Sequence, residues 1–222
     1  MEHLSLFITH ARSSKSYDYL LFITILSCCF YGCHCSGELV QSNDKSLFDW
    51  RKIIKQSSLS FYGDRAQYCL PYHKGDPFYH GTDVLFLPQD ITNPVTLLTE
   101  YIGLRDKLHG AAASLSIRED GSQPSRSWFN SLFFSILNHS FGGHSTRAGG
   151  ATFYASLGLS EDIIQALGRW SSTAWKIKTP SSLLYVAFIF SHHHLPPHTH
   201  INSLSYSFFS APSLSIYLWE ST

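Results

Sequence analysis

The chain has 222 residues, 44% of them hydrophobic, which is enough for one domain with a real core or for two small ones. Its 16 basic residues are balanced by 16 acidic residues, and this balance counts against a nucleic-acid binder, because phosphate contacts need Lys and Arg. The basic residues are unevenly spread, however. Between Arg51 and Gly81 five basic residues stand against two acidic ones, so a basic face is compatible with a neutral chain.

Residues 1–16 have no clear assignment, and Tyr17–Cys35 predicts one buried helix. The apolar run Leu20–Tyr31 is 12 residues long, shorter than the roughly 20 residues that a membrane-spanning helix needs. No basic start and no small-residue cleavage site precede it, so a signal peptide is not expected. We therefore expect a core helix and no membrane as a partner.

The five cysteines are concentrated, with four of them between Cys28 and Cys35. This crowding does not suit an ordinary disulfide framework. Together with His34 these residues suggest a metal site, but structural zinc sites draw on two separated pairs, and no second pair follows. Buried free thiols in a reducing compartment are the preferred interpretation, and no cofactor is expected.

Short apolar segments predict a three-stranded antiparallel sheet. The expected strands are Leu47–Ile53, Gln67–Pro71 and Asp83–Leu87. The segment His73–Pro77 lies between the last two strands and is rich in residues that break regular structure, so we expect a polar turn there.

Helices account for most of the rest. Apolar residues at spacings of three and four predict a helix over Pro94–His109. Ser160 is expected to cap a short helix that ends at Gly168, with acidic residues in its first turn. The other expected elements are helices at Ser127–Asn138 and Ser145–Leu157 and a short strand at Leu115–Ile117. The fold class is therefore α+β, mostly helical with a small sheet.

The composition changes after Pro180. Residues 181–222 contain ten Ser and one charged residue, Glu220, and they include the run His192–His194. A histidine tract is able to bind metal, but no periodicity persists here. We expect a disordered, low-complexity tail over residues 179–222 that resembles translated non-coding sequence.

One stretch points to chemistry. Residues 143–153 read GHSTRAGGATF, and residues 158–172 read GLSEDIIQALGRWSS. His144 and Arg147 stand three residues apart near a helix start, so they share one face. The guanidinium of Arg suits a phosphate, His donates a hydrogen bond or moves a proton, and a helix N-terminus attracts an anion. These properties suit a phosphate site, but an H-x-x-R pair taken alone is a weak signal, and a solvated or core His is the more common interpretation.

This stretch resembles the H-x-x-R box of the tyrosine recombinases, in the version found in recombinase-like proteins of fungal mobile elements. The resemblance runs from about Tyr17 to Lys176 and is strongest over His144–Trp175. It implies a catalytic domain over residues 17–178 of the type that breaks and rejoins DNA through a 3′-phosphotyrosine link, for DNA recombination and integration.

The resemblance also implies individual roles. In that family two Arg clamp the scissile phosphate, a Lys in a hairpin turn protonates the leaving oxygen, and a Tyr is the nucleophile. Lys74 matches the hairpin lysine, and His144 and Arg147 match the box. Trp170 matches a later His or Trp that donates a hydrogen bond to the phosphate; a core aromatic residue is the plainer interpretation.

Two positions depart from the family pattern. Cys35 stands where the first Arg belongs, in FYGCHCSGEL, and Lys178 stands where the nucleophilic Tyr belongs. Tyr185 follows seven residues later, inside the suspect tail. We therefore predict a partial, degenerate recombinase that binds DNA weakly and does not cleave it. Cys35 is expected at the rim of the phosphate pocket, at a helix C-terminal end.

Two alternatives stay open. One is an active recombinase whose C-terminus is mis-spliced after Ile177, and the other is a non-catalytic helix-turn-helix-like DNA-binding module over residues 145–168. The second helix of that module carries Glu161 and Asp162 and no Arg that reads bases, which disfavours it. Under the main interpretation the partner is the DNA phosphate backbone, with self-association on DNA, and the location is the nucleus.

Overall fold

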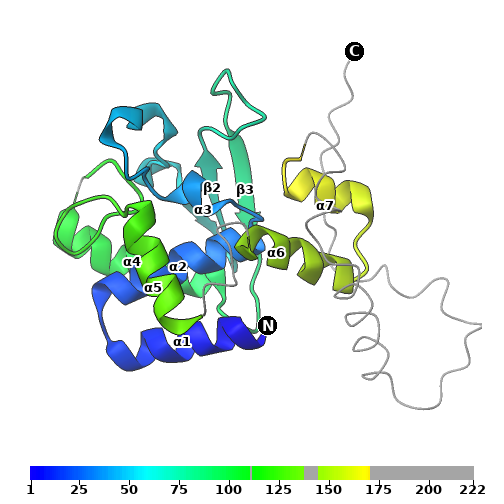
Figure 1. The fold of residues 1–222 in the computed structure, drawn as a ribbon, viewed down its shortest axis with the longest axis horizontal. Helices are drawn as coiled ribbons and strands as arrows, with labels where there is room; N and C mark the ends of the chain where they lie inside the picture. The colour runs from blue at the N-terminus through cyan, green and yellow to red at the C-terminus, as the bar shows by residue number, and fades with distance from the viewer. Residues whose placement is uncertain (111, 138–144, 171–222) are drawn as a thin grey trace, which may run out of the picture.

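The computed structural model describes residues 1–110, 112–137 and 145–170. It confirms the predicted fold class, a mostly helical α+β arrangement with one small antiparallel sheet (Figure 1). The helices are α1 (Glu2–Ser14), α2 (Tyr17–Tyr31), α3 (Ser36–Leu39), α4 (Pro94–His109), α5 (Arg126–Ile136), α6 (Ser145–Ser156) and α7 (Glu161–Leu167). The strands are β1 (Ser60–Tyr62), β2 (Arg65–Leu70) and β3 (Thr82–Phe86), in the order β1-β2-β3.

Helix α2 forms the centre of the core. Its residues from Leu21 to Tyr31 are all buried, as expected for a helix that is apolar on every side. Helices α1, α4 and α6 pack around it, and Figure 1 shows α6 and α7 at the opposite side of the molecule from α4. The helix predicted for residues 17–35 is therefore present and buried.

That helix is shorter than predicted, because it ends at Tyr31 rather than at Cys35. Gly32 caps it, and Cys33 adopts a left-handed φ of 48°. A Cβ added to Gly32 would lie 2.7 Å from the His34 ring, so only glycine lets the chain turn here. Cys35 is consequently the N-cap of α3, and its expected place at a helix C-terminal end was wrong.

Residues 1–16, for which the sequence made no prediction, contribute a helix to the same core. Phe7 on α1 is buried, and its ring lies 5.3 Å from that of Phe133 and 5.6 Å from that of Phe22 between ring centroids. The N-terminal segment is therefore packed against α2 and α5 rather than appended to them.

The sheet has the expected second and third strands but a different first strand. Residues alternate along β2, with Ala66, Tyr68 and Leu70 facing the core, and Tyr68 pairs with Val84 of β3. The prediction of a strand at residues 47–53 was wrong. Two 3-10 turns lie there, because the side chains of Asp44 and Asp49 accept hydrogen bonds from backbone N–H groups two residues on.

The predicted strand at Leu115–Ile117 is also absent. Only an isolated bridge between Ser114 and Lys55 forms near it. The hydroxyl of Tyr101 instead satisfies the backbone, accepting from Ile117 N at 2.9 Å and lying 3.2 Å from Leu115 O. The helices predicted at residues 94–109 and 145–157 are confirmed, as are the described part of the helix predicted at 127–138 and the Ser160 cap.

The five cysteines are thiols rather than halves of a disulfide, and Cys28, Cys29 and Cys33 are buried. Among the described residues there is no group of three side chains suited to hold a metal ion, and none of the helices there is long and apolar enough to cross a membrane. The predictions for residues 179–222 lie outside the described residues.

Candidate phosphate-binding site

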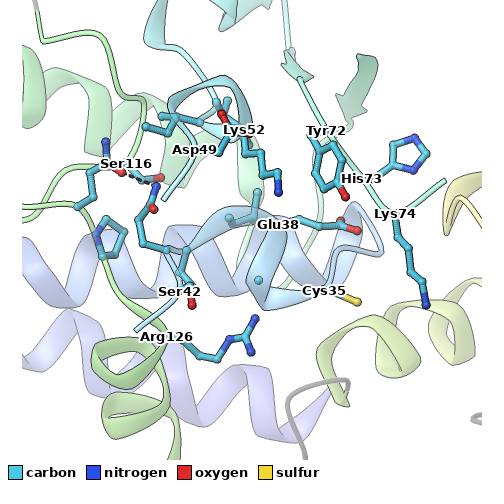
Figure 2. A pocket seen from close by; sticks show the side chains of 18 of the residues that line it. Cys35, Glu38, Ser42, Asp49, Lys52, Tyr72, His73, Lys74, Ser116 and Arg126 are labelled. Carbon is cyan, nitrogen blue, oxygen red and sulfur yellow. Dashed lines mark hydrogen bonds between the residues drawn. The ribbon is translucent and has the colours of Figure 1, made fainter. Parts of the chain in front are cut away.

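A pocket of about 780 Å³ opens between α3, the 3-10 turns that follow it, the loop from β2 to β3, the start of α5, and the ends of α6 and α7 (Figure 2). Its lining is predominantly positive: two acidic residues, Glu38 and Asp49, face five basic ones, Lys52, Lys74, Arg126, Arg147 and Arg169. This excess of cationic side chains around one concavity favours an anionic ligand.

Three of the four residues singled out in the sequence line this pocket. Lys74, Arg147 and Trp170 come from the β2–β3 loop, from α6 and from the end of α7. They are separated by up to 96 positions in the chain, so only the fold brings them together. The fourth, His144, lies outside the described residues.

Arg147 is held from three directions. Its Nη1 donates to the Sγ of Cys35 at 3.0 Å, and its Nη2 donates to the carbonyl oxygen of Gly168. The guanidinium carbon also lies 4.5 Å from the centre of the Trp170 ring, a cation–π distance. Cys35 therefore lies beside Arg147 at the rim of the pocket, as predicted, and Trp170 is the surface on which Arg147 stacks.

The position of α6 depends on its glycines. A Cβ added to Gly150 would overlap the carbonyl oxygen of Phe30, and one added to Gly149 would lie 3.0 Å from the Phe30 ring. The Gly149-Gly150 pair thus lets α6 lie directly against the end of α2. This close approach brings Arg147 to Cys35, four residues beyond α2.

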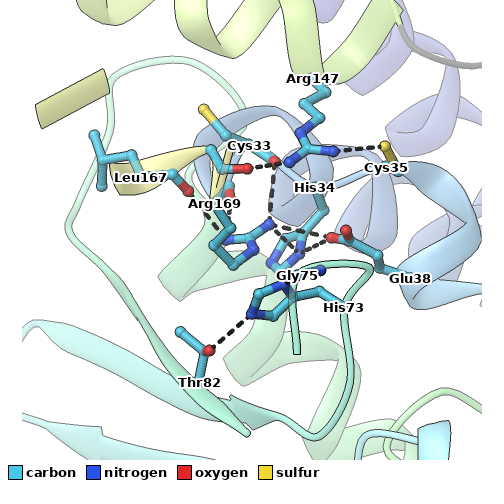
Figure 3. Close-up of polar contacts among 12 residues, drawn as sticks. Cys33, His34, Cys35, Glu38, His73, Gly75, Thr82, Arg147, Leu167 and Arg169 are labelled. Carbon is cyan, nitrogen blue, oxygen red and sulfur yellow. Dashed lines mark hydrogen bonds and ion pairs between the residues drawn. The ribbon is translucent and has the colours of Figure 1, made fainter. Parts of the chain in front are cut away.

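Arg169 fixes the other side of the pocket by binding the chain between α2 and α3 (Figure 3). Its Nη1 donates to Gly32 O at 3.1 Å, and its Nη2 donates to Cys33 O and to Glu38 Oε2, both at 3.1 Å. The residue was part of the motif recognised in the sequence, but no role was assigned to it. A positive φ of 55° at Arg169 turns its side chain back toward α3.

Glu38 and His34 complete a buried polar cluster with Tyr68. His34 Nδ1 lies 3.0 Å from Glu38 Oε2, and Tyr68 Oη lies 2.9 Å from His34 Nε2. Arg169 Nη2 also lies 3.0 Å from His34 Nδ1, but its two hydrogens are directed to Cys33 O and Glu38 Oε2. The consistent arrangement therefore has Nδ1–H donating to the carboxylate and the Tyr68 hydroxyl donating to Nε2. Glu38 therefore accepts hydrogen bonds from His34 and Arg169, and the positive charge of Arg169 balances its negative charge in the pocket wall.

The pKa values of this cluster follow from burial and charge. Burial lowers the pKa of His34 to about 4, even though the hydrogen bond with Glu38 favours the charged ring. Burial also favours the protonated form of Glu38, but the hydrogen bond from His34 and the nearby charge of Arg169 outweigh it and hold its pKa below the ordinary range. His34 is neutral and Glu38 is ionised near neutral pH.

The turn that carries Lys74 is built by local hydrogen bonds. Asp76 accepts from the backbone of Gly81 at 2.8 Å, and Gly75 N donates to His73 Nδ1 at 3.2 Å. A Cβ on Gly75 would lie 4.0 Å from Arg169 O, so the turn is close to the end of α7. Figure 2 shows Lys74 at the same end of the pocket as Cys35.

Solved structures share this architecture. XerH site-specific recombinase bound to difH substrate, in a pre-cleavage complex, superposes with a TM-score of 0.54 and 14% identity, over 87% of this chain and 53% of that one. The fold is that of a recombinase catalytic domain. A post-cleavage complex of XerH with palindromic difH substrate gives a TM-score of 0.53 and 13% identity, over 86% of this chain and 52% of that one. No protein-family model and no curated protein sequence matches the chain.

The recombinase fold found here spans about half the length of the XerH chains it matches. Within it, three basic residues that line the pocket were not among the site residues predicted from the sequence: Lys52, Arg126 and Arg169. Arg169 was hidden because its role is to bind backbone carbonyl groups of a distant loop. Arg126 precedes the predicted start of α5 and belongs to no recognised motif, so no signal in the sequence identified it.

Proposed function

We propose that this chain is a DNA-binding protein of the tyrosine recombinase type that, as its sequence stands, does not cleave DNA. The observation that carries the proposal is the joint presence of Lys74, Arg147 and Trp170 in one predominantly positive pocket of a recombinase fold. The ligand of the pocket is a phosphate of the DNA backbone. The relationship to recombinases of fungal mobile elements is part of this proposal.

The available donors support a phosphate ligand. Arg147 carries five N–H groups, and the bonds to Cys35 and Gly168 use one on each terminal nitrogen. Stacking on Trp170 restricts the plane of the guanidinium, so its remaining donors are oriented before a ligand arrives. Lys74 adds an ammonium group from the β2–β3 loop, and this group is able to supply the proton that a departing oxygen needs.

The loss of cleavage follows from two residues. Cys35 lacks the charge and the donor fork of an Arg, and the loss of one such donor costs about 10²–10³ in rate. Lys178 stands where the family has its nucleophilic Tyr, and the phosphotyrosine link needs the phenol oxygen. Both defects act on the same step, so their costs are not expected to add.

The arrangement of α6 and α7 favours this proposal over a helix-turn-helix module. One face of α6 is committed to α2 through Gly150, and Glu161 and Asp162 are exposed at the start of α7. Acidic residues in the first turn of a recognition helix would repel the DNA backbone.

A covalent-trapping experiment tests the proposal. The full chain is mixed with a DNA duplex nicked beside a candidate cleavage site, and adducts that survive denaturation are sought on a gel. We expect reversible binding that weakens steeply with salt, because phosphate contacts release counterions, and no adduct. An adduct that disappears in Tyr185→Phe would instead establish an active recombinase. Binding that is unchanged in Arg147→Ala would refute the phosphate site.

A further inference from the structure

We infer that Arg126 supplies the second guanidinium of the phosphate pocket, in place of the arginine whose position Cys35 occupies. This inference rests on the proposed function and adds a second phosphate-binding residue to it. Arg126 lines the same pocket as Arg147, although it comes from α5 rather than from the segment that holds Cys35.

The guanidinium of Arg126 lies over α3. A Cβ built on Gly37 would be only 2.5 Å from Arg126 Nη2, so the charged group occupies the space that a side chain at residue 37 would fill. Gly37 is two residues beyond Cys35, within the same turn. Figure 2 shows the side chain of Arg126 directed from α5 toward α3, between Ser42 and Cys35 in this view.

The backbone of Arg126 is tied to the chain that follows α3. Gln41 N donates to Pro124 O, and Arg126 N donates to Gln41 O, each at 2.8 Å. One residue on, Ser127 N donates to the side chain of Asn43 at 2.8 Å. These bonds fix the start of α5 beside α3, so the base of the Arg126 side chain is held in place even though its end is exposed.

The other basic residues of the lining are less suited to this role. Both terminal nitrogens of Arg169 already donate hydrogen bonds, to Gly32 O, Cys33 O and Glu38 Oε2. Lys52 offers a point charge rather than a planar fork, and its Nζ lies 4.4 Å from the centre of the Tyr72 ring. Arg126 forms no ion pair with a carboxylate of the described residues, so its charge is available to a ligand.

The chemistry of a phosphodiester explains why a second guanidinium matters. The group carries one negative charge shared by two non-bridging oxygens, and each oxygen accepts hydrogen bonds from a planar donor fork. Arg147 and Arg126 approach the region around Cys35 from α6 and α5, on different walls of the pocket. Two arginines so placed hold one phosphate between them.

The test measures binding of the full chain to a fluorescently labelled DNA duplex by anisotropy, over a series of salt concentrations. Arg126→Ala is expected to raise Kd about ten-fold at low salt, because the loss of one charge-assisted hydrogen bond typically has an effect of this size. The magnitude of the slope of log K against log salt concentration should decrease by about one, the value that corresponds to one lost phosphate contact. Arg126→Lys should keep the slope and lose part of the affinity. Lys107→Ala, which removes an exposed cation of α4 outside the pocket, is the control and should change neither.

A rescue experiment asks whether the two positions serve the same phosphate. Cys35→Arg should restore most of the affinity of Arg126→Ala, and it should raise the affinity of the otherwise unchanged chain by a smaller factor. An equal gain in both backgrounds would mean independent sites and would overturn the inference.

The outcomes separate this inference from the function on which it rests. If Arg147→Ala weakens binding and Arg126→Ala behaves as Lys107→Ala does, the role of Arg126 is refuted and the proposed function stands. If neither arginine variant differs from the control, the phosphate pocket itself is refuted, and the inference with it.

Discussion

His34 is the residue on which the geometry of the pocket wall depends. It is fully buried between Tyr68 and Glu38, and Glu38 in turn receives Arg169. The imidazole therefore connects the sheet to the loop that carries Cys35. A neutral His with one donor and one acceptor satisfies both partners, whereas a protonated ring would have to leave Tyr68 without its acceptor.

This environment predicts a loss of stability in acid. The pKa of His34 is lowered to about 4 from an ordinary value of 6.5. Between these two pH values the imidazole is protonated in the unfolded chain and neutral in the folded chain. The stability contributed by the neutral ring is present above pH 6.5 and is lost as pH falls toward 4, on the order of 3 kcal/mol in all. Glu38, whose pKa is also lowered, acts in the same direction at lower pH.

The measurement is the urea midpoint of unfolding as a function of pH. His34→Gln should flatten the profile between pH 6.5 and 4 relative to the unchanged chain, whatever its absolute stability. Leu6→Gln, at an exposed position of α1 that does not titrate, is the control and should leave the profile as it was. Parallel profiles for the unchanged chain and His34→Gln would contradict the assignment of a buried neutral ring.

At the scale of elements, the contact between α2 and α6 decides where the pocket lies. The contact has room for no side chain at Gly150, because the Phe30 carbonyl oxygen occupies the place of a Cβ. A shift of α6 away from α2 would separate Arg147 from Cys35 and open the wall that they form together.

We therefore expect Gly150→Ala to destabilise the protein by about 2 kcal/mol, as overpacking at a close helix contact does. Gly103→Ala is the matched control, because Gly103 lies within α4 with open space around it. There the same change should stabilise the helix by about 0.5–1 kcal/mol. Denaturant unfolding of both variants checks the sign, and equal effects would show that α6 does not pack against α2 in this way.

At the scale of the whole molecule, the N-terminal helix belongs to the body that holds the pocket. Phe7 connects α1 to α2 and α5 through its ring contacts with Phe22 and Phe133. Because α5 also carries Arg126, the packing of α1 against α5 helps to hold one wall of the pocket in place.

Phe7→Ala should accordingly cost about 3–5 kcal/mol of unfolding free energy, the usual range for a buried Phe. Leu6→Ala is the control on the same helix, since Leu6 is 55% exposed and its loss should cost little. Thermal unfolding of the two variants distinguishes them. A Phe7→Ala variant as stable as Leu6→Ala would mean that α1 is not part of the core.

The sequence alone determined the elements whose signals are local. These signals are the apolar surface all round α2, the spacing of apolar residues in α4, the Ser160 cap and the breakers around Lys74. Each acts over a few residues, and each predicted element is present, although α2 ends four residues earlier than predicted. The H-x-x-R stretch likewise pointed to a recombinase, and the fold agrees with that family's catalytic domain.

Tertiary structure decided what depends on distant partners. Residues 47–53 have the composition of a strand, but the side chains of Asp44 and Asp49 accept hydrogen bonds from the local backbone and hold it in 3-10 turns. Arg169 reaches its place because a loop distant in the sequence presents carbonyl groups to it, and Arg126 reaches its place because Gly37 of α3 leaves space for it. Local structural preferences depend on residues that are close in the sequence, whereas a pocket forms only when segments distant in the sequence have packed together.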